Sequence, residues 1–282
     1  MRVKEIQCKT AIGKCGFPGG GFSINPYIGC GHDCAYCYAR FMKRFTGHDV
    51  ERWGSFVDAR MNIAAVLTKQ LRSKKYLHDQ IYIGTVTDPY QPIEKKYRLM
   101  RGVLEALEGR KDSVSILTKS DLVLRDIDLL KKIPKADVSV TVNTLDERWK
   151  ELVEPGSPTI RRRLAALRRL AEEGIPAIVM MGPCWPFFTD VDALFREFKK
   201  AGVSHVFSES FNTTGGNWTG VEIVLRKHYP ALLLKMQKIF FDENEFHNFY
   251  DAVRRKMNVL SKQYKIPVTA YFDLGHAAKS KK

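Results

Sequence analysis

Three cysteines lie close together in the segment NPYIGCGHDCAYCYAR, which runs from Asn25 to Arg40. Cys30, Cys34 and Cys37 have the spacing C-x3-C-x2-C, and glycines on both sides of the first cysteine let the backbone turn tightly around a compact inorganic group. Three thiolates that hold a four-iron cluster leave one iron without a protein ligand. The spacing therefore predicts a [4Fe-4S] site at which one iron is open to a small molecule.

Two simpler interpretations of the same thiols stay open. A structural zinc site would combine the three cysteines with His32 or with a distant residue as the fourth ligand. The thiols would otherwise be buried without any metal, as free cysteines often are. A short motif always carries a false-positive risk, so the surrounding fold has to support the cluster.

The composition is that of a soluble globular protein. The 282 residues are 44% hydrophobic and 27% charged, and this length suits one main domain. No apolar run approaches the roughly 18 residues of a membrane span, and the first residues lack the apolar core of a signal peptide. We therefore expect a cytoplasmic protein without a membrane partner. In that compartment the six cysteines stay reduced.

The net charge of +15 favours a polyanionic partner such as a nucleic acid. Part of this excess lies between Arg161 and Arg169, where Leu164, Leu167 and Leu170 have the spacing of a buried helical stripe. We expect the arginines of this helix to form a solvated face. The charge alone consequently does not identify a partner.

Short apolar strands alternate with amphipathic helices along most of the chain. The expected strands are Ser23–Ile28, Ile81–Val86, Ser113–Thr118, Val138–Val142, Ile175–Met181 and Ser204–Ser208. The expected helices are Asp58–Leu71, Tyr97–Leu107, Leu122–Ile133, an arginine-rich helix that ends at Gly174, and Asp192–Lys200, with a further helix beginning over Tyr38–Phe45. Such alternation indicates parallel strands with right-handed crossovers, as in a doubly covered sheet or an open barrel of six units. The cysteine loop follows the first strand, where such folds place their active sites.

Three regions are expected. Residues 1–22 form an N-terminal leader with Cys8 and Cys15, residues 23–215 form the core, and residues 216–282 form a C-terminal extension. The extension is mostly helical, and we expect it to cover or close the barrel. Its predicted elements are helices Ala231–Phe241 and Phe246–Gln263, a strand Pro267–Phe272 and a disordered tail HAAKSKK.

The segments CAYCYARF, TVTDPYQP and ILTKSDLVLRD, within an organisation from Asn25 to about Asn212, resemble the radical S-adenosylmethionine (radical SAM) superfamily and its spore photoproduct lyase-like family. The resemblance implies an α/β fold with a partial (β/α)6 barrel. It also implies an enzyme whose open iron chelates S-adenosylmethionine and cleaves it reductively to a 5'-deoxyadenosyl radical that abstracts hydrogen. An external electron donor of the flavodoxin or ferredoxin type would be required.

Two tyrosines flank the third cysteine of the motif. The resemblance makes Tyr36 and Tyr38 candidates for lining the cofactor pocket, and it makes Tyr38 a catalytic candidate. An aromatic ring can pack against adenine through its flat apolar face. The alternative is that one or both rings only shield the cluster from water.

Several polar residues follow the predicted strands, where the resemblance places the methionine and ribose parts of the cofactor. Lys119 offers a cation for the carboxylate, Thr87 a hydroxyl group, and Thr141 with Asn143 hydrogen bonds for the ribose. Asp88 either orients the cofactor amine or caps the loop around a proline. Lys119 is the strongest of these candidates, because solvation alone poorly explains a lysine at the end of an apolar strand.

One departure from the lyase pattern affects the predicted reaction. The lyase carries a hydrogen-donating cysteine at the position that holds Thr85 here, and an O–H bond is too strong to quench a carbon radical efficiently. The lyase's own repair route is therefore in doubt. Cys184, in GPCWP after the fifth strand, is the alternative donor, and its competing interpretation is a free buried thiol.

The substrate is the least determined part of the prediction. A nucleic acid is slightly favoured, for lesion repair or modification of the nucleic acid. Radical SAM chemistry on a peptide or a small molecule is the first alternative, since the sequence contains no recognisable binding module. A non-catalytic iron–sulfur protein for electron transfer or sensing is the second, and it would need neither a cofactor pocket nor Lys119.

Overall fold

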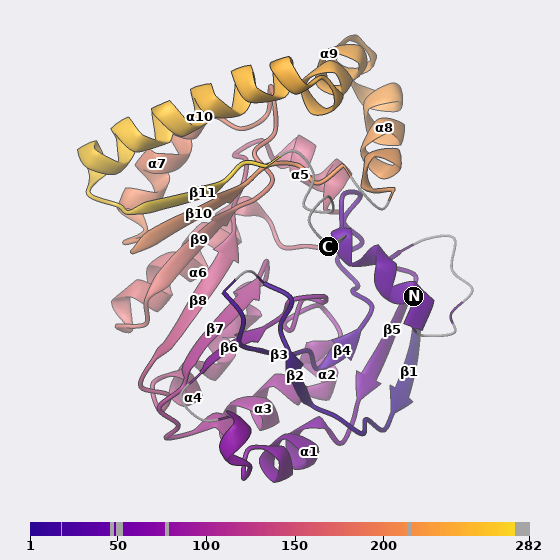
Figure 1. The fold of residues 1–282 in the computed structure, drawn as a ribbon, viewed down its shortest axis with the longest axis vertical. Coiled ribbons are helices and arrows are strands. Elements are labelled where there is room, and N and C mark those ends of the chain that lie inside the picture. The colour runs from indigo at the N-terminus through magenta and orange to yellow at the C-terminus, as the bar shows by residue number, and fades with distance from the viewer. Residues whose placement is uncertain (18, 46–47, 49–52, 77–78, 214–215, 274–282) are drawn as a thin grey trace.

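The structure is a computed structural model that describes residues 1–273 except 18, 46–47, 49–52, 77–78 and 214–215. Its main sheet has eight strands in the order β11-β10-β9-β8-β7-β6-β3-β2 (Figure 1). These strands are β2 (Ile12–Lys14), β3 (Phe22–Ile24), β6 (Gln80–Ile83), β7 (Ser113–Thr118), β8 (Ala136–Thr141), β9 (Ala177–Met181), β10 (His205–Glu209) and β11 (Val268–Tyr271). Five of the predicted core strands are therefore confirmed, and the first is confirmed only in its N-terminal part, as β3.

All neighbours from β3 to β11 pair in parallel, and β2 pairs antiparallel with β3. The strand predicted near the C-terminus, β11, extends the sheet beyond β10 with Val206 opposite Val268. The α/β class and the parallel sheet of a partial radical SAM barrel are thus as predicted, and the C-terminal region adds a strand as well as helices.

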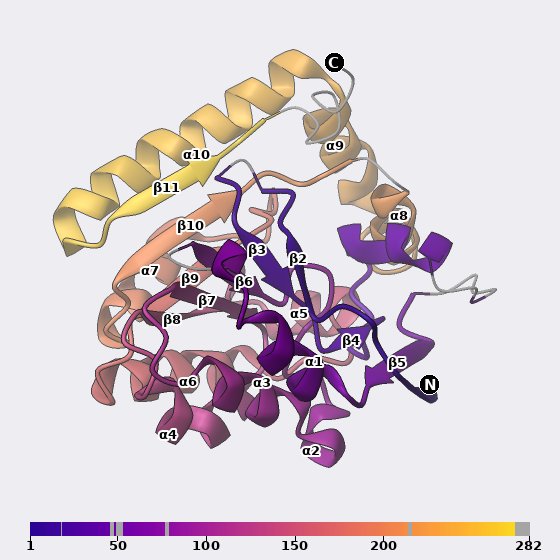
Figure 2. The same ribbon diagram turned by 60° about the horizontal axis from the view of Figure 1, so that its bottom comes forward.

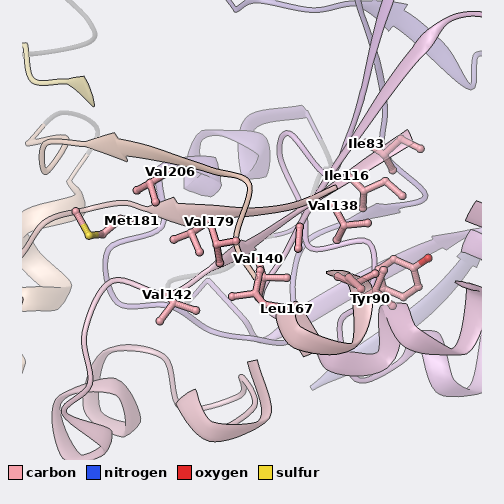
Figure 3. Close-up of a cluster of buried hydrophobic side chains, with 14 of the residues drawn as sticks. Ile83, Tyr90, Ile116, Val138, Val140, Val142, Leu167, Val179, Met181 and Val206 are labelled. Carbon is pink, nitrogen blue, oxygen red and sulfur yellow. The ribbon is translucent and has the colours of Figure 1, made fainter. Parts of the chain in front are cut away.

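The helices of the core cover one face of this sheet (Figures 1 and 2). They are α1 (Ile63–Gln70), α2 (Glu94–Tyr97), α3 (Leu99–Leu107), α4 (Ile127–Leu130), α5 (Glu147–Val153), α6 (Ile160–Glu172) and α7 (Val191–Lys200), with the 3-10 helices η2 (Lys74–Tyr76) and η3 (Asp121–Asp126). A further 3-10 helix, η1 (Tyr38–Phe45), directly follows the cysteine loop. The strand side chains on the covered face are fully buried. Val138, Val140 and Val179, for example, are 0% exposed and lie in one cluster with Leu167 of α6 (Figure 3).

The other face of the sheet is not covered in the same way. Along β7, β8 and β10 the burial alternates, so that every second side chain stays half-buried. Many of these half-buried side chains are polar, such as Ser115, Asp137 and His205. This polar inner face is therefore available to a ligand, whereas the outer face is the hydrophobic core.

The N-terminal residues differ from the prediction of a separate leader. Within 1–22, β1 (Arg2–Ile6) pairs with β5 (Phe56–Arg60), and β2 joins the main sheet. A second sheet of order β1-β5-β4 includes β4 (Tyr27–Ile28), so the predicted strand Ser23–Ile28 is divided between the two sheets. The helix expected from Asp58 was wrong at its start, because β5 is buried between β1 and β4 and the helix begins at Ile63. The domain boundaries at 23, 215 and 216 remain predictions.

Other predicted elements are interrupted. The helix Tyr97–Leu107 is broken at Arg98, which has φ 52°, and the helix Leu122–Ile133 consists of η3 followed by α4. Between β8 and α6, where the sequence analysis placed no helix, the chain forms α5, whose N-cap Asp146 accepts a hydrogen bond from the backbone of Trp149.

The C-terminal region is mostly helical, as predicted. It consists of α8 (Asn217–His228), which was not predicted, α9 (Pro230–Phe241) and α10 (Glu243–Tyr264), followed by β11. The tail HAAKSKK lies outside the described residues. Among the described helices, none combines the length and the apolar character that crossing a membrane would require.

Candidate cofactor site

The cysteine loop depends on two glycines for its shape. Gly29 has φ 84°, and a Cβ atom there would collide with the Phe56 carbonyl oxygen of β5. Gly156, from the segment after α5, lies directly on the loop, where a Cβ atom would collide with the Gly31 carbonyl oxygen. Its backbone N–H donates to the His32 carbonyl oxygen at 3.0 Å. The cysteine loop is therefore held between the small sheet and the segment that joins α5 to α6.

Buried side chains after β6 fix the same loop. Thr87 Oγ1 donates to the Gly29 carbonyl oxygen at 2.6 Å, and Gln91 Nε2 donates to that oxygen at 3.2 Å. Gln91 Oε1 accepts from the Gly31 N–H at 2.7 Å. The hydroxyl of Thr87, predicted to bind the cofactor, thus has partners within the protein, and cofactor binding by Thr87 stays a prediction.

The three cysteines form an enclosed group of sulfur atoms. Cys30 and Cys34 are each 7% exposed, and Cys30 and Cys37 pack against an apolar wall that includes Trp53 and Phe56. Burial raises the pKa of all three thiols, that of Cys30 to about 12. Each of the sulfurs of Cys30 and Cys37 lies close enough to raise the pKa of Cys34 further.

This donor set fits an iron–sulfur cluster. Iron requires thiolates, and its positive charge would stabilise the thiolate charges that the apolar surroundings disfavour. Each cysteine of a four-iron cluster binds a different iron, so the three sulfurs need not converge on one point. Among the described residues, no three His, Cys, Asp or Glu side chains are placed to hold a single metal ion. His32, the zinc ligand of the alternative interpretation, lies instead with Nδ1 at 3.2 Å from Asp88 Oδ2.

Asp88 connects the loop after β6 to the end of β7. Its Oδ1 accepts from Thr118 Oγ1 at 2.6 Å and from the Tyr90 N–H at 2.9 Å, and its Oδ2 accepts from the Lys119 N–H at 2.7 Å. Burial alone would raise the pKa of this carboxyl, but His32 and these donors lower it to about 2. The carboxylate has the loop-capping partners of one of the two predicted roles, and a contact with the cofactor amine stays a prediction.

A second buried carboxylate, Glu154, lies beside the cysteines. It is 1% exposed and accepts hydrogen bonds from Tyr36 Oη and Arg163 Nη2. Lys119 Nζ lies 4.0 Å from Glu154 Oε1 and 5.6 Å from the centre of the Tyr36 ring. Burial would raise the pKa of Glu154, but Arg163, Lys119 and the hydrogen bonds lower it to about 2.

Lys119 follows β7, and its positive charge acts to lower the pKa of Cys34 and Cys37. Burial lowers its pKa, but the neighbouring Cys34 and Glu154 outweigh this effect, so the net pKa is raised and the side chain stays charged. With only 17% of the side chain exposed, the ammonium group lies between Glu154 and the cysteine loop. The structure therefore brings Lys119, Tyr36 and the three cysteines together, as the sequence predicted.

The two tyrosines take different positions. Tyr36 packs edge to face on Trp185 with ring centres 5.2 Å apart, and its hydroxyl points to Glu154. Tyr38 begins η1 and is 43% exposed, and its hydroxyl donates to the Thr85 carbonyl oxygen at the end of β6. Tyr36 is thus part of the buried network, whereas Tyr38 lines the more open side of the loop.

The residues predicted to bind ribose lie after β8. Thr141 and Asn143 are 2% and 3% exposed. Asn143 Nδ2 donates to the Gly182 carbonyl oxygen at 3.1 Å, and the Thr141 carbonyl oxygen accepts from Arg163 Nη1 at 3.1 Å. Both residues therefore have partners within the protein, and ribose binding stays a prediction.

Cys184 lies in the core. It is 0% exposed, and its Sγ is 3.1 Å from Ser208 Oγ and 3.7 Å from the Met181 carbonyl oxygen. Burial raises the pKa of its thiol to about 12. The structure does not bring this thiol to the cysteine loop, so its role as a hydrogen donor stays a prediction without geometric support.

Arg163 is the main residue of the site that the sequence analysis misplaced. It was expected on a solvated face, but it is 1% exposed and bonds to Glu154, because it shares a buried stripe with Ile160, Leu167 and Leu170. Their spacing of three and four residues was the signal that could have identified it. Leu164, expected in the stripe, is only partly buried.

Comparison with known proteins agrees with this fold. The sequence profile of the radical SAM superfamily matches residues 24–198. The uncharacterized protein MJ0683 of Methanocaldococcus jannaschii is 38% identical over 199 residues, which cover 71% of this chain and 74% of that protein. The chain therefore belongs to the radical SAM superfamily and is a radical SAM enzyme.

Two further similarities are more distant. A radical SAM Nalpha-GlyT isomerase of Pseudomonas phage M6 is 25% identical over 222 residues, which cover 77% of this chain and 43% of that protein. A solved structure of a spore photoproduct lyase variant with bound AdoMet and dinucleoside spore photoproduct has a TM-score of 0.68 at 17% identity, over 95% of this chain and 81% of that chain. The fold is therefore similar to that of spore photoproduct lyase.

Proposed function

We propose that this enzyme binds a [4Fe-4S] cluster through Cys30, Cys34 and Cys37, cleaves S-adenosylmethionine reductively there, and acts on a nucleic acid. When bound, the cluster supplies the electron that breaks a sulfur–carbon bond of the cofactor. The Lys119 ammonium group would bind the methionine carboxylate, and the enclosed loop would exclude water. The observation that carries the cofactor assignment is the proximity of Lys119 to the buried thiols.

Nucleic acid is favoured as the substrate by the polar inner face of the sheet. Ser115 Oγ donates to Asp137 Oδ2 at 2.7 Å and accepts from Gln80 Nε2 at 3.0 Å. Asp137 Oδ1 is buried and has no hydrogen-bond partner among the described residues. An unpaired buried acceptor is suited to an N–H group of a nucleobase, and half-buried rings such as Tyr82 and Phe207 suit stacking.

The net charge and one structural neighbour support the same substrate class. The net charge of +15 would attract a phosphate backbone. The similar lyase structure holds a dinucleoside spore photoproduct, which makes a base-sized ligand compatible with this fold. Tyr38, half-exposed beside the third cysteine, and Cys184 remain the proposed catalytic residues.

The test measures 5'-deoxyadenosine formation by the anaerobically reconstituted, reduced enzyme. Single- and double-stranded oligonucleotides should bind with an affinity that falls steeply from low to moderate salt, and the accepted strand should increase cofactor cleavage. Asp137→Asn should reduce this increase and leave the cleavage without oligonucleotide unchanged. Absence of binding at low salt, or stimulation only by peptides, would exclude nucleic acid. Absence of product above a cluster-free control would exclude cofactor cleavage itself.

A further inference from the structure

Trp53 lies in the apolar wall beside the cysteine loop. It is only 4% exposed. It belongs to one buried cluster with Cys30, Ala39 and Phe56, and Cys37 packs against this cluster. The rings of Trp53 and Phe56 meet edge to face with their centres 5.9 Å apart. Because Phe56 belongs to β5, the small sheet holds the indole ring next to the sulfur atoms.

The turn that carries Trp53 rests directly on the cysteine loop. Gly54 has φ 90°, and a Cβ atom there would collide with the side chain of Asp33. Asp33 lies between Cys30 and Cys34 in the sequence and itself has φ 50°. The indole ring and the loop are therefore held in one position relative to each other.

The indole N–H group of Trp53 is a hydrogen-bond donor that the protein itself leaves unused. Its Nε1 is buried and has no hydrogen-bond partner among the described residues. Burial raises the pKa of the Cys37 thiol, and the Trp53 side chain lies close enough to that sulfur to oppose the rise. A neutral thiol is a weak acceptor, whereas a charged sulfur accepts a stronger hydrogen bond. The donor therefore lies at an atom that becomes a good acceptor once it binds metal as a thiolate.

We propose that the indole N–H of Trp53 donates a hydrogen bond to the Cys37 sulfur of the bound cluster and thereby raises the reduction potential of the cluster. The inference rests on the proposed function, because it needs a cluster held by the three cysteines.

The direction of this effect follows from charge. Reduction adds one negative charge that the sulfur atoms share, and apolar surroundings disfavour this charge. A donor at one sulfur consequently stabilises the reduced state more than the oxidised state. The electron comes from the external donor of the flavodoxin or ferredoxin type. The indole keeps its proton, and no covalent bond forms or breaks.

The experiment compares Trp53→Phe with Trp149→Phe. Both changes remove an indole N–H group and keep an aromatic ring. Trp149 is 0% exposed, and its Nε1 likewise has no hydrogen-bond partner among the described residues. Its ring stacks on Phe188 with the ring centres 3.9 Å apart, and it is not part of the wall beside the cysteines. Each protein is reconstituted anaerobically, its iron and sulfide are measured, and the reduction potential is determined by EPR-monitored titration without S-adenosylmethionine.

Trp53→Phe should shift the ratio of reduced to oxidised cluster about tenfold towards the oxidised form, which corresponds to a potential about 59 mV lower for one electron. Trp149→Phe should leave the potential unchanged. A mere loss of packing would admit water, which stabilises the reduced state and raises the potential, so the sign of the shift separates the two causes. An unchanged or raised potential in Trp53→Phe, or an equal fall in both variants, would overturn the inference.

A second measurement uses the unaltered protein and decides the question even where Trp53→Phe binds no cluster. The tryptophan indoles are labelled with 15N, and the reduced protein is studied by pulsed EPR. A 15N coupling to the cluster is expected, and a full cluster without this coupling would overturn the role of Trp53 alone. Absence of iron and sulfide from the unaltered protein would instead refute the proposed function.

Discussion

Arg163 and Glu154 form an ion pair in which both side chains are only 1% exposed. The same guanidinium donates to the carbonyl oxygens of Thr141 at 3.1 Å and Pro158 at 3.0 Å, so it joins α6 to the end of β8 and to the loop between them. Glu154 in turn accepts from the Tyr36 hydroxyl within the cysteine loop. The ion pair therefore connects the end of β8 to the loop that carries the three cysteines.

Replacing Arg163 should destabilise the fold strongly. Arg163→Met removes the bonded cation of the buried Glu154 carboxylate and leaves only Lys119, at 4.0 Å, as a cationic neighbour; breaking a buried ion pair costs about 3–5 kcal/mol in other proteins. We expect a loss of this size in the free energy of unfolding measured with urea. Arg162→Ala is the matched control, because it removes an exposed pair with Asp121 and should cost no more than about 1 kcal/mol.

The double change Glu154→Gln with Arg163→Met should recover part of the lost stability, because the buried ion pair is then removed as a whole, although Lys119 loses its carboxylate partner. Equal losses for Arg163→Met and Arg162→Ala would show that the buried pair is not the structural link proposed here. A double variant no more stable than Arg163→Met would point to lost packing of the arginine as the cause.

The Glu154 carboxyl should make stability depend on pH at the acidic end. Its pKa is about 2 in the folded protein against an ordinary value of 4.5, so the folded state binds fewer protons between these values. The stabilisation is present above pH 4.5 and is lost as the pH falls towards 2. Urea unfolding at pH 3 to 6 should show a smaller pH dependence in the double variant Glu154→Gln with Arg163→Met. Asp88, whose pKa is also lowered to about 2, contributes to the dependence that remains, and Asp137, whose pKa is raised to about 6, opposes it.

The sequence predicted those parts of the fold that follow from local periodicity. Five core strands, the N-terminal part of the first and most of the helices are where the apolar spacing placed them, and Lys119 at the end of β7 could be predicted because a strand end in such a fold faces the site. The loop of Cys30, Cys34 and Cys37 was recognisable because its spacing is local as well.

What the sequence analysis missed depends on contacts between distant residues. β5 has a helical pattern at Asp58, but its pairing with β1 and β4 decides its conformation. Arg163 is buried because Glu154 is positioned to compensate its charge. No local sequence pattern identifies Glu154 as the partner of Arg163. Cys184 follows the predicted strand, yet its exposure depends on Ser208 of the next strand and on the helices outside the sheet.

Asp137→Asn should stabilise the protein at neutral pH. Burial raises the pKa of this carboxyl to about 6 from an ordinary 3.8, although the hydrogen bond from Ser115 opposes the shift. The folded state is therefore favoured below pH 3.8, and this advantage is lost as the pH rises through 6. At pH 7.5 the variant should gain up to about 3 kcal/mol, because each pKa unit corresponds to about 1.4 kcal/mol. At pH 4 the gain should be small, and an equal gain at both values would contradict the assignment.

Iron binding should depend on three of the six cysteines only. The triple change of Cys30, Cys34 and Cys37 to alanine should abolish iron and sulfide incorporation after anaerobic reconstitution, because no other described thiol joins this enclosed group. Cys8→Ala with Cys15→Ala is the control and should retain the full content of one four-iron cluster. A triple variant with full iron, or an unaltered protein that takes up zinc stoichiometrically and no iron, would contradict the cluster.

Lys119 should determine the affinity for S-adenosylmethionine. Its ammonium group is held in place 4.0 Å from Glu154 and above the Tyr36 ring, so it is oriented before the cofactor arrives. Lys119→Met removes a charge-assisted hydrogen bond to the methionine carboxylate, which is worth about 1.5–3 kcal/mol, and should raise the Kd about 10- to 150-fold. The measurement is equilibrium binding of the cofactor to the reconstituted protein, with iron content as a check on the cluster. Lys150→Met is an informative comparison, because Lys150 is also buried but donates to the Ser157 carbonyl oxygen at 2.5 Å. It should lower stability and leave the Kd of the folded protein within about twofold, whereas equal Kd values for Lys119→Met and the unaltered enzyme would remove Lys119 from the cofactor site.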